Sequence, residues 1–297
     1  MQTTFNTTNN TMTTINVPSF REKAITVRLR RAMYIPNKFD ASATAAAEGA
    51  FGAGNVGRYT KRLLKNCAQL KSTQKAFQDI YSYVVDHTLP WMDEGVRVLP
   101  NASYVDFAQE VGQLRRKAMA EVEKLGAVWD TAVLADKARL GSMWNPTDYP
   151  TKEEMLDKWG ISVVFSPIPA SEDFRIDMDE SDRKALDDAI HEVEKNSTGY
   201  LLKEMLKPVA AMATKLSVPI GDEGSIFRDS LMKNLEDVAN RAKKLNINHD
   251  ARVDEVIADI EKVTGSVTLT ALRETTEVRN ATAKQMKSLA DKINQWF

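Results

Sequence analysis

The sequence predicts a mainly α fold: a long antiparallel helical hairpin and a C-terminal helical bundle, with a small β-sheet or β-hairpin. The 297 residues include only 13 glycines and 10 prolines, so long stretches lack the residues that interrupt helices. Two consecutive segments, 55–88 and 103–140, also repeat apolar residues at steps of four and three. That spacing places the apolar residues on one face of each helix and favours burial of both faces.

The two repeats predict helices that pack on each other. The first repeat contains Leu63, Cys67, Leu70, Gln74, Phe77, Tyr81 and Val84. The second contains Phe107, Val111, Leu114, Ala118, Val122, Leu125, Trp129 and Ala132. Only residues 89–102 join the two segments, and so short a link favours an antiparallel pair. The lone cysteine of the first repeat is expected to act as a small core hydrophobe.

Short strands are predicted where apolar and polar residues alternate. This pattern occurs at residues 25–29, 161–165 and 174–178, and residues 96–100 are a further short candidate. Prolines follow the 161–165 segment, so we expect that segment and 174–178 to form a hairpin. The hairpin is predicted to pair with the strand at 25–29, which gives a small sheet against the helices.

Several residues are typical of helix ends. Asp40 is expected to cap an alanine-rich helix that runs through Ala50. Ser103 with Asp106 resembles a capping box for the second long helix, and Gly141 is a suitable residue just beyond its end. Ser225 is expected to cap a helix in the C-terminal half.

The C-terminal half predicts further helices. The segment 180–216 contains Gly199 and Pro208, so we expect a kink or two helices there. Helices are also predicted from Ser225, around 253–263, and over 268–296. The last of these has few apolar residues between 274 and 284, and that part is expected to be solvated or to bind a partner.

The predicted domain organisation has three parts. Residues 1–20 form a disordered tail, residues 21–150 hold the strand and the helical hairpin, and residues 151–297 hold the β-hairpin and the C-terminal helices. The last two parts are either separate units or one continuous domain. The N-terminus lacks the basic and apolar regions of a signal peptide, no apolar run is long enough for a transmembrane helix, and a single cysteine suits a reducing compartment. We therefore expect a cytoplasmic protein with no membrane partner.

Charge is unevenly distributed along the chain. Residues 1–75 carry twelve Lys and Arg against three acids, which gives a charge of +9. The net charge of the chain is −1, so the remaining residues carry −10. The basic residues that form the candidate site are Arg28, Arg30, Arg31, Arg58, Lys61, Arg62 and Lys65. Such a set attracts phosphate backbones, which predicts nucleic-acid binding. The alternatives are a solvated face, a partner-binding face, or pairing with the acidic C-terminal half.

No catalytic or metal-binding constellation is evident in the sequence. The segment 52–57 matches G-x-G-x-x-G, but an alanine-rich helix precedes it where a dinucleotide site needs a strand, so a flexible turn is the better interpretation. The three histidines, His87, His191 and His249, are far apart in sequence and one cysteine cannot build a zinc cluster. We expect no cofactor, no metal and no enzymatic activity.

A set of turn, strand-end and cap segments carries a resemblance to a known family. The segments are Leu89-Pro90-Trp91, Leu140-Gly141-Ser142-Met143-Trp144, Asp148-Tyr149-Pro150, Val163-Val164-Phe165-Ser166-Pro167-Ile168-Pro169, Asp173-Phe174-Arg175, Phe227-Arg228-Asp229-Ser230-Leu231 and Leu245-Asn246-Ile247. Over about residues 25–263 the chain resembles a helical domain-of-unknown-function family of phages and bacteria, often encoded beside MoxR-type AAA+ ATPases and von Willebrand A-type proteins. The resemblance implies a phage or prophage protein that acts beside an ATPase, and it implies no reaction.

These observations favour a non-catalytic helical interaction or adaptor protein with a protein partner, and the resemblance points to an AAA+ ATPase. The alternative hypothesis is a nucleic-acid-binding protein of phage DNA metabolism that uses the basic N-terminal region. Self-association into a homo-oligomer is compatible with either hypothesis.

Overall fold

The computed structural model describes residues 20–55, 57–169 and 179–297. These residues are mainly helical with a small antiparallel sheet, as predicted. The helices are α1 (Phe20–Lys23), α2 (Ala41–Phe51), α3 (Ala68–Asp86), α4 (Tyr104–Leu140), α5 (Lys152–Leu156), α6 (Glu180–Leu216), α7 (Asp229–Leu245), α8 (Ala251–Ser266), α9 (Leu269–Glu274) and α10 (Thr276–Asn294). Among them, none is long and apolar enough to cross a membrane.

The strands form two antiparallel sheets. They are β1 (Ala24–Ala32), β2 (Asn37–Phe39), β3 (Thr60–Arg62), β4 (Leu89–Pro90), β5 (Val96–Pro100) and β6 (Gly160–Pro167). The larger sheet has the order β4-β5-β1-β6, and β2 pairs with β3. The predicted strands at 25–29, 96–100 and 161–165 are confirmed, as is the pairing of the first with the last, in which Leu29 faces Val163. The strand predicted at 174–178 and the predicted tail lie outside the described residues, apart from Phe20, which is buried at the start of α1.

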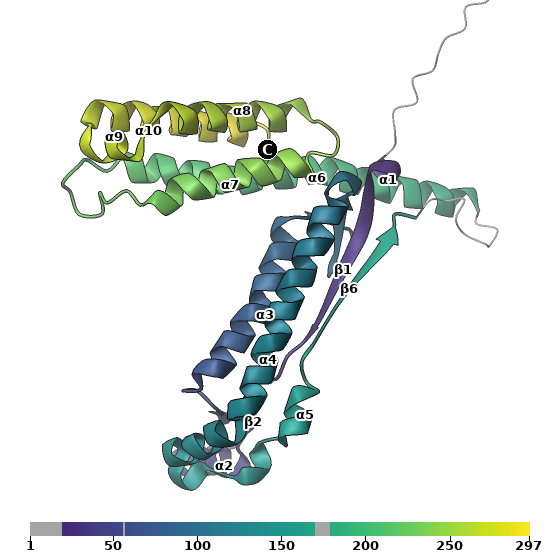
Figure 1. Ribbon diagram of the computed structural model, residues 1–297, viewed down its shortest axis with the longest axis vertical. Helices are drawn as coiled ribbons and strands as arrows, with labels where there is room; N and C mark the ends of the chain where they lie inside the picture. Colours follow the sequence, from purple (N-terminus) through teal and green to yellow (C-terminus); the bar gives the residue numbers. More distant parts are fainter. Residues whose placement is uncertain (1–19, 56, 170–178) are drawn as a thin grey trace, which may run out of the picture.

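A column of two helices and one sheet forms the centre of the molecule (Figure 1). Helices α3 and α4 are antiparallel: Gln69 near the start of α3 donates a hydrogen bond to the backbone oxygen of Glu121 at 3.2 Å, while Tyr83 near its end lies against Phe107 at the start of α4. Side chains of both helices and of the sheet share one apolar core. Tyr81 is the exception in the first repeat, because its side chain is exposed.

The first long helix is shorter than predicted. It begins at Ala68, not near residue 55, and the residues before it form β3 and a turn. Leu64 has a left-handed backbone with φ of 53°, a conformation that cannot continue a right-handed helix. Cys67 precedes the first helical residue, and its sulfur accepts a hydrogen bond from the Leu70 N–H at 3.4 Å. Cys67 therefore packs against the core as predicted, although it is only half-buried and also caps the helix.

The predicted helix ends are confirmed in part. The Asp40 carboxylate accepts the Ala43 N–H at 2.9 Å, as expected for a cap. The capping box at Ser103 is wrong, because a 3-10 turn, η1 (Asn101–Ser103), leads directly into α4 and the Ser103 side chain makes no cap hydrogen bond. Ser225 does not cap α7 either, since that helix begins four residues later, at Asp229.

Helices α6 to α10 pack together across one end of the column (Figure 1). Helix α6 runs without interruption through Pro208, so the expected division into two helices is not found. The segment predicted as one helix over 268–296 is divided at Thr275 into α9 and α10. Thr275 has an extended backbone there, with φ of −114° and ψ of 107°, which is outside the helical range.

The segment between 274 and 284 is only partly solvated: six of its eleven residues are exposed, but one face of the helix is buried, which the sequence did not predict. Arg279 in this segment is 1% exposed. Its guanidinium donates hydrogen bonds to the backbone oxygens of Lys215, Leu216, Val218, Ser225 and Leu272 at 2.8 to 3.2 Å. Three of these acceptors lie at the end of α6 or just after it, where helical carbonyls lack partners of their own. The Arg279 side chain thus connects the C-terminal end of α6, the loop before α7, and α9.

Replacement of this arginine tests its structural role. The change Arg279→Met keeps an unbranched side chain but leaves the five carbonyls, two of them buried and three part-buried, without their donor. We expect a loss of about 3–5 kcal/mol in the free energy of unfolding, measured by urea denaturation. The control Lys287→Met, at an exposed position of the same helix, is expected to change that free energy by less than about 0.5 kcal/mol. Equal effects of the two changes would contradict this role.

Candidate functional site

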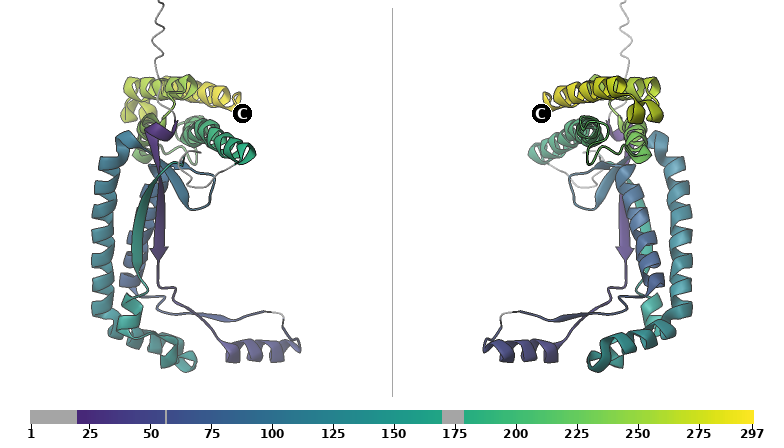
Figure 2. Two further views of the ribbon diagram at one scale, coloured as in Figure 1. Left: turned by 90° about the vertical axis from the view of Figure 1, so that its right-hand side faces the viewer. Right: turned by 90° about the vertical axis from the view of Figure 1, so that its left-hand side faces the viewer.

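An arm made of β2, α2 and β3 projects from one end of the column. Figure 2 shows that the arm and the C-terminal helices extend from the same side of the column, at its opposite ends. The two strands pair over three residues each, and the Asp40 N–H donates to the Tyr59 oxygen at 3.0 Å where the strands end. The Tyr59 N–H in turn donates to the hydroxyl of Thr44 at 2.9 Å. The arm is therefore held in shape by its own polar contacts.

Helix α2 buries none of its eleven residues, all of which the structure describes. Its residues 43, 46, 47, 50 and 51 follow the helical spacing that places side chains on one face. The first four are alanines and the last is Phe51, which is 84% exposed. Glu48 carries the helix's one charge. Because the rest of the chain buries none of its residues, this apolar helix presents a free surface.

Local sequence accounts for the helix in the absence of packing. Alanine has the highest helix propensity, Asp40 caps the start, and Gly52 has the left-handed backbone typical of the residue after a helix end, with φ of 60°. A helix this short is marginal in water by itself. The two caps and the strand pair below it therefore hold α2 in place.

The arm is anchored to the column by the buried cation of Lys61. This side chain is 7% exposed and forms ion pairs with Asp40 at 3.0 Å and with Asp148 at 2.6 Å. Its ammonium also donates to the backbone oxygen of Met143 at 3.0 Å. Burial alone would lower the pKa of Lys61, but the two carboxylates raise it above its ordinary value. Lys61 therefore stays charged and connects the arm to the segment after α4.

A second anchor is formed by Asp136 of α4, whose side chain is 2% exposed. It accepts hydrogen bonds from the Leu64 N–H at 2.8 Å, from Arg139 at 2.6 Å and from the Tyr149 hydroxyl at 2.6 Å. Arg139 also donates to the backbone oxygen of Arg62 at 2.6 Å. Burial by itself would raise the pKa of Asp136, but the three donors outweigh burial and lower that pKa. The carboxylate thus holds the left-handed turn at Leu64.

Of the seven predicted basic residues, those at 58–65 do not lie on the first long helix as expected, because β3 and a turn occupy that segment. Lys61 is buried in its ion pairs and is not available to a nucleic acid. The Arg31 guanidinium lies over the Tyr81 ring at 4.3 Å and donates to the Phe77 oxygen at 3.2 Å. The other five are exposed: Arg28, Arg30, Arg58, Arg62 and Lys65.

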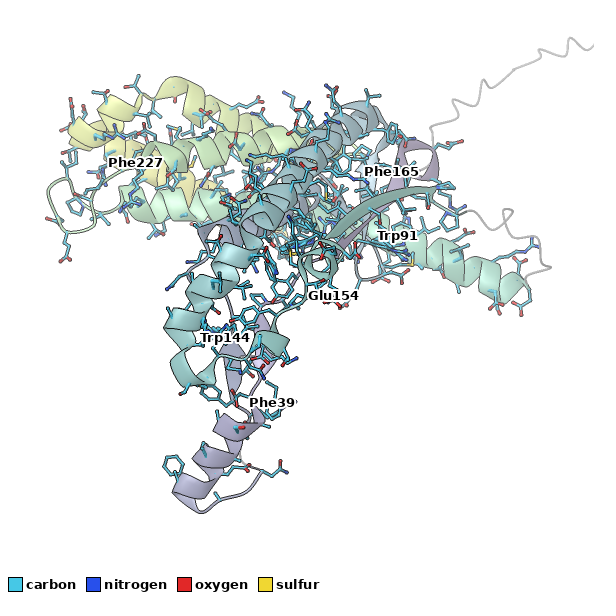
Figure 3. The ribbon with its side chains drawn as sticks, turned by 60° about the horizontal axis from the view of Figure 1, so that its bottom comes forward. Phe39, Trp91, Trp144, Glu154, Phe165 and Phe227 are labelled. Atoms are coloured by element: carbon cyan, nitrogen blue, oxygen red, sulfur yellow. The ribbon has the colours of Figure 1, made fainter. Side chains whose placement is uncertain are left out.

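Three of the exposed cations surround the base of the arm. Arg58 precedes β3 and lies over the Phe39 ring at 4.5 Å, while Arg62 ends β3 and Lys65 follows it. Figure 3 labels Phe39 on the arm and Trp144 on the adjoining end of the column. The two acids of the arm are engaged, Asp40 with Lys61 and Glu48 with the Asn55 N–H at 2.7 Å. The arm is thus an apolar helix with a basic base.

The structure places the G-x-G-x-x-G segment in the loop that leaves α2. The strand β3 follows it, where a dinucleotide site has a helix, and the segment's residue 56 is outside the described residues. No group of three or more His, Cys, Asp or Glu within the described ranges could hold a metal ion.

Comparison with known proteins adds no family to these observations. No protein-family model, no curated protein and no solved structure matches the chain. The site is therefore interpreted from its own geometry.

Sequence reasoning missed the anchors, because their members are far apart along the chain. Asp136 and Leu64 are 72 residues apart, and no local pattern relates them. The exposure of α2 did have a signal. A run with six alanines and one charge in eleven residues lacks both the large apolar residues of a core helix and the charges of a solvated one.

The second anchor predicts a pH-dependent stability. Asp136→Asn removes a carboxylate whose pKa is lower in the folded protein, so the charge contributes stability at neutral pH that is lost as pH falls. We expect the variant to lose about 1–3 kcal/mol at pH 7. This difference should shrink below the ordinary Asp pKa of about 3.9 as the folded carboxylate is protonated. Denaturant unfolding from pH 7 to pH 3 measures it.

The matched control is Asp130→Asn, at an exposed position of the same helix. We expect it to change the unfolding free energy by less than about 0.5 kcal/mol at every pH. A difference between wild type and Asp136→Asn that stayed constant over the whole range would contradict the assignment of a charged anchor.

Proposed function

We propose that this chain is a non-catalytic interaction protein that binds a protein partner through the α2 arm. The observation that supports this most is the unburied helix at the arm's end, with Phe51 exposed. Recognition of an amphipathic or apolar helix by a groove on another protein is a recurrent mode of association. Aromatic side chains that enter such a groove supply much of the binding energy.

The charges at the base of the arm define the partner's chemistry. Arg58, Arg62 and Lys65 are exposed around an apolar helix, so the complementary surface is an apolar groove with an acidic rim. Opposite charges at a rim raise the association rate and orient the two surfaces more than they add affinity. The resemblance to the phage and bacterial family supports an AAA+ ATPase of the MoxR type as the partner that presents this groove.

A binding measurement with a purified MoxR-type AAA+ ATPase tests the proposal. Phe51→Ser removes the exposed ring at the end of α2 and is expected to weaken binding at least about tenfold, because it removes an aromatic anchor. Arg58→Glu is expected to slow association and to reduce its salt dependence. Surface plasmon resonance of the purified proteins measures both effects.

The control for Phe51→Ser is Ile226→Ser, an exposed apolar position in the loop before α7 that is 73% accessible. It should leave ATPase binding unchanged. Absence of binding by the wild type, or equal binding by wild type and Phe51→Ser, would overturn the proposed docking.

Nucleic-acid binding is the second candidate function, and one observation favours it. Arg28 and Arg30 alternate along β1, so they lie on the same face of the sheet, and both are exposed. Their neighbours on β6 are Val164 and Ser162. This face carries two cations and no carboxylate among these four positions.

A gel-shift titration separates the two functions. If the sheet binds DNA, the double change Arg28→Glu and Arg30→Glu should abolish the shift at low salt, since phosphate contacts dominate such affinity. The control pair Arg115→Glu and Lys117→Glu reverses two exposed charges of α4 and should retain the shift. No shift of single- or double-stranded DNA by the wild type at low salt would exclude this function.

A further inference from the structure

A cavity of about 570 Å³ lies where the column meets the C-terminal helices, at the opposite end of α4 from the arm. It is lined by the end of α3, by η1 and the first turn of α4, and by the end of α7 with the loop that follows. Figure 1 shows the C-terminal helices crossing the column at this end. The volume is within the range of sites for small organic ligands.

The cavity lining is strongly basic. It contains the cations of Lys23, Arg241, Lys243 and Lys244, against one carboxylate among the described lining residues, that of Asp106. Lys243 forms an exposed ion pair with a glutamate of α8. No described residue forms an ion pair with Lys23, Arg241 or Lys244. Several cations that converge on one cavity with little compensating charge favour an anionic occupant.

One wall of the cavity is aromatic and apolar. The His87 imidazole is stacked on the Tyr83 ring, with ring centroids 4.1 Å apart, and Phe107 lies 5.6 Å from the same tyrosine ring. Leu245 and Ile247 add two further apolar residues to the lining. A bare inorganic anion would leave this wall uncovered, whereas an aromatic ring attached to the anion would cover it.

His87 is a titratable residue of the cavity lining. Its Nδ1 lies 2.8 Å from the backbone carbonyl oxygen of Tyr83. A carbonyl oxygen can only accept, so Nδ1 carries the proton and donates, and Nε2 is the nitrogen that does not take part in this bond. Burial lowers the pKa of His87, and the nearby cations of Arg241 and Lys244 lower it further. The hydrogen bond to Tyr83 and the carboxylate of Asp86 act in the opposite direction. The other charged or titratable groups of the lining are Lys23, Lys243, Asp106 and His249.

We propose that this cavity binds a nucleoside monophosphate or a closely related aromatic phosphate. The phosphate lies among Lys23, Arg241 and Lys244, and the ring covers the aromatic wall. This binding is independent of the α2 arm, which lies at the other end of α4.

Calorimetric titration of the full chain with AMP tests the proposal, with adenosine and inorganic phosphate as partial ligands. We expect adenosine and inorganic phosphate each to bind at least about tenfold more weakly than AMP, because each lacks one of the two recognised parts. Arg241→Gln with Lys244→Gln should weaken AMP binding by about tenfold or more, since two charge-assisted contacts are lost. The control Lys233→Gln, at an exposed position of α7, should leave it unchanged.

A second measurement locates the ligand. An anion beside His87 stabilises its protonated form, so saturating AMP should raise the pKa of His87, followed by NMR of the imidazole signals. Far-ultraviolet circular dichroism confirms that the variants remain folded.

Three results would overturn the proposal. The first is that the wild type binds neither AMP nor phosphate at millimolar concentration. The second is that phosphate binds as tightly as AMP, which would leave no role for the aromatic wall. The third is that AMP binds without changing the His87 signals and with the same affinity in the variant Arg241→Gln with Lys244→Gln. None of these three results depends on whether the arm binds an ATPase.

Discussion

The packing of α3, α4 and the four-stranded sheet into one apolar core is the interaction on which the rest of the structure depends. Each of these elements is too exposed to be stable alone, and together they bury Phe77, Phe107, Leu125 and Trp129 almost completely. The burial of such large side chains supplies the main favourable term in folding. It also makes the column a fixed support, because the arm and the C-terminal helices both attach to its ends.

The apolar spacing of the sequence predicted the two helices and the β1–β6 pair of this column, but not β4 or the place of β5 in the sheet. The repeat in α4 is nearly regular, so that helix was placed to within about a residue at each end, and the strands at Ile25 and Ile161 were recognised by alternation. The start of α3 was misplaced because Leu63 and Leu64 are buried by a turn that happens to continue the helical spacing. Apolar spacing records burial, and a turn can bury the same residues as a helix.

The polar sites could not be predicted in the same way. Arg279 was assigned to a solvated stretch because apolar residues are few between 274 and 284. Its five acceptors are backbone carbonyls, and these have no signature in a sequence. Lys61 was grouped with the exposed cations because its partners Asp40 and Asp148 are distant in sequence. Along the chain, α2 separates it from Asp40, and α3 and α4 separate it from Asp148. Charged residues are thus identified as buried only when the fold brings their partners together.

The length of α4 has a mechanical consequence. Its 37 residues, at about 1.5 Å each, form a continuous rod about 55 Å long that joins the basic cavity to the arm. Coupling between the two ends has to pass through the column, in which α3 and the sheet pack beside α4. The length of α4 also sets the distance between two molecules bound at its ends.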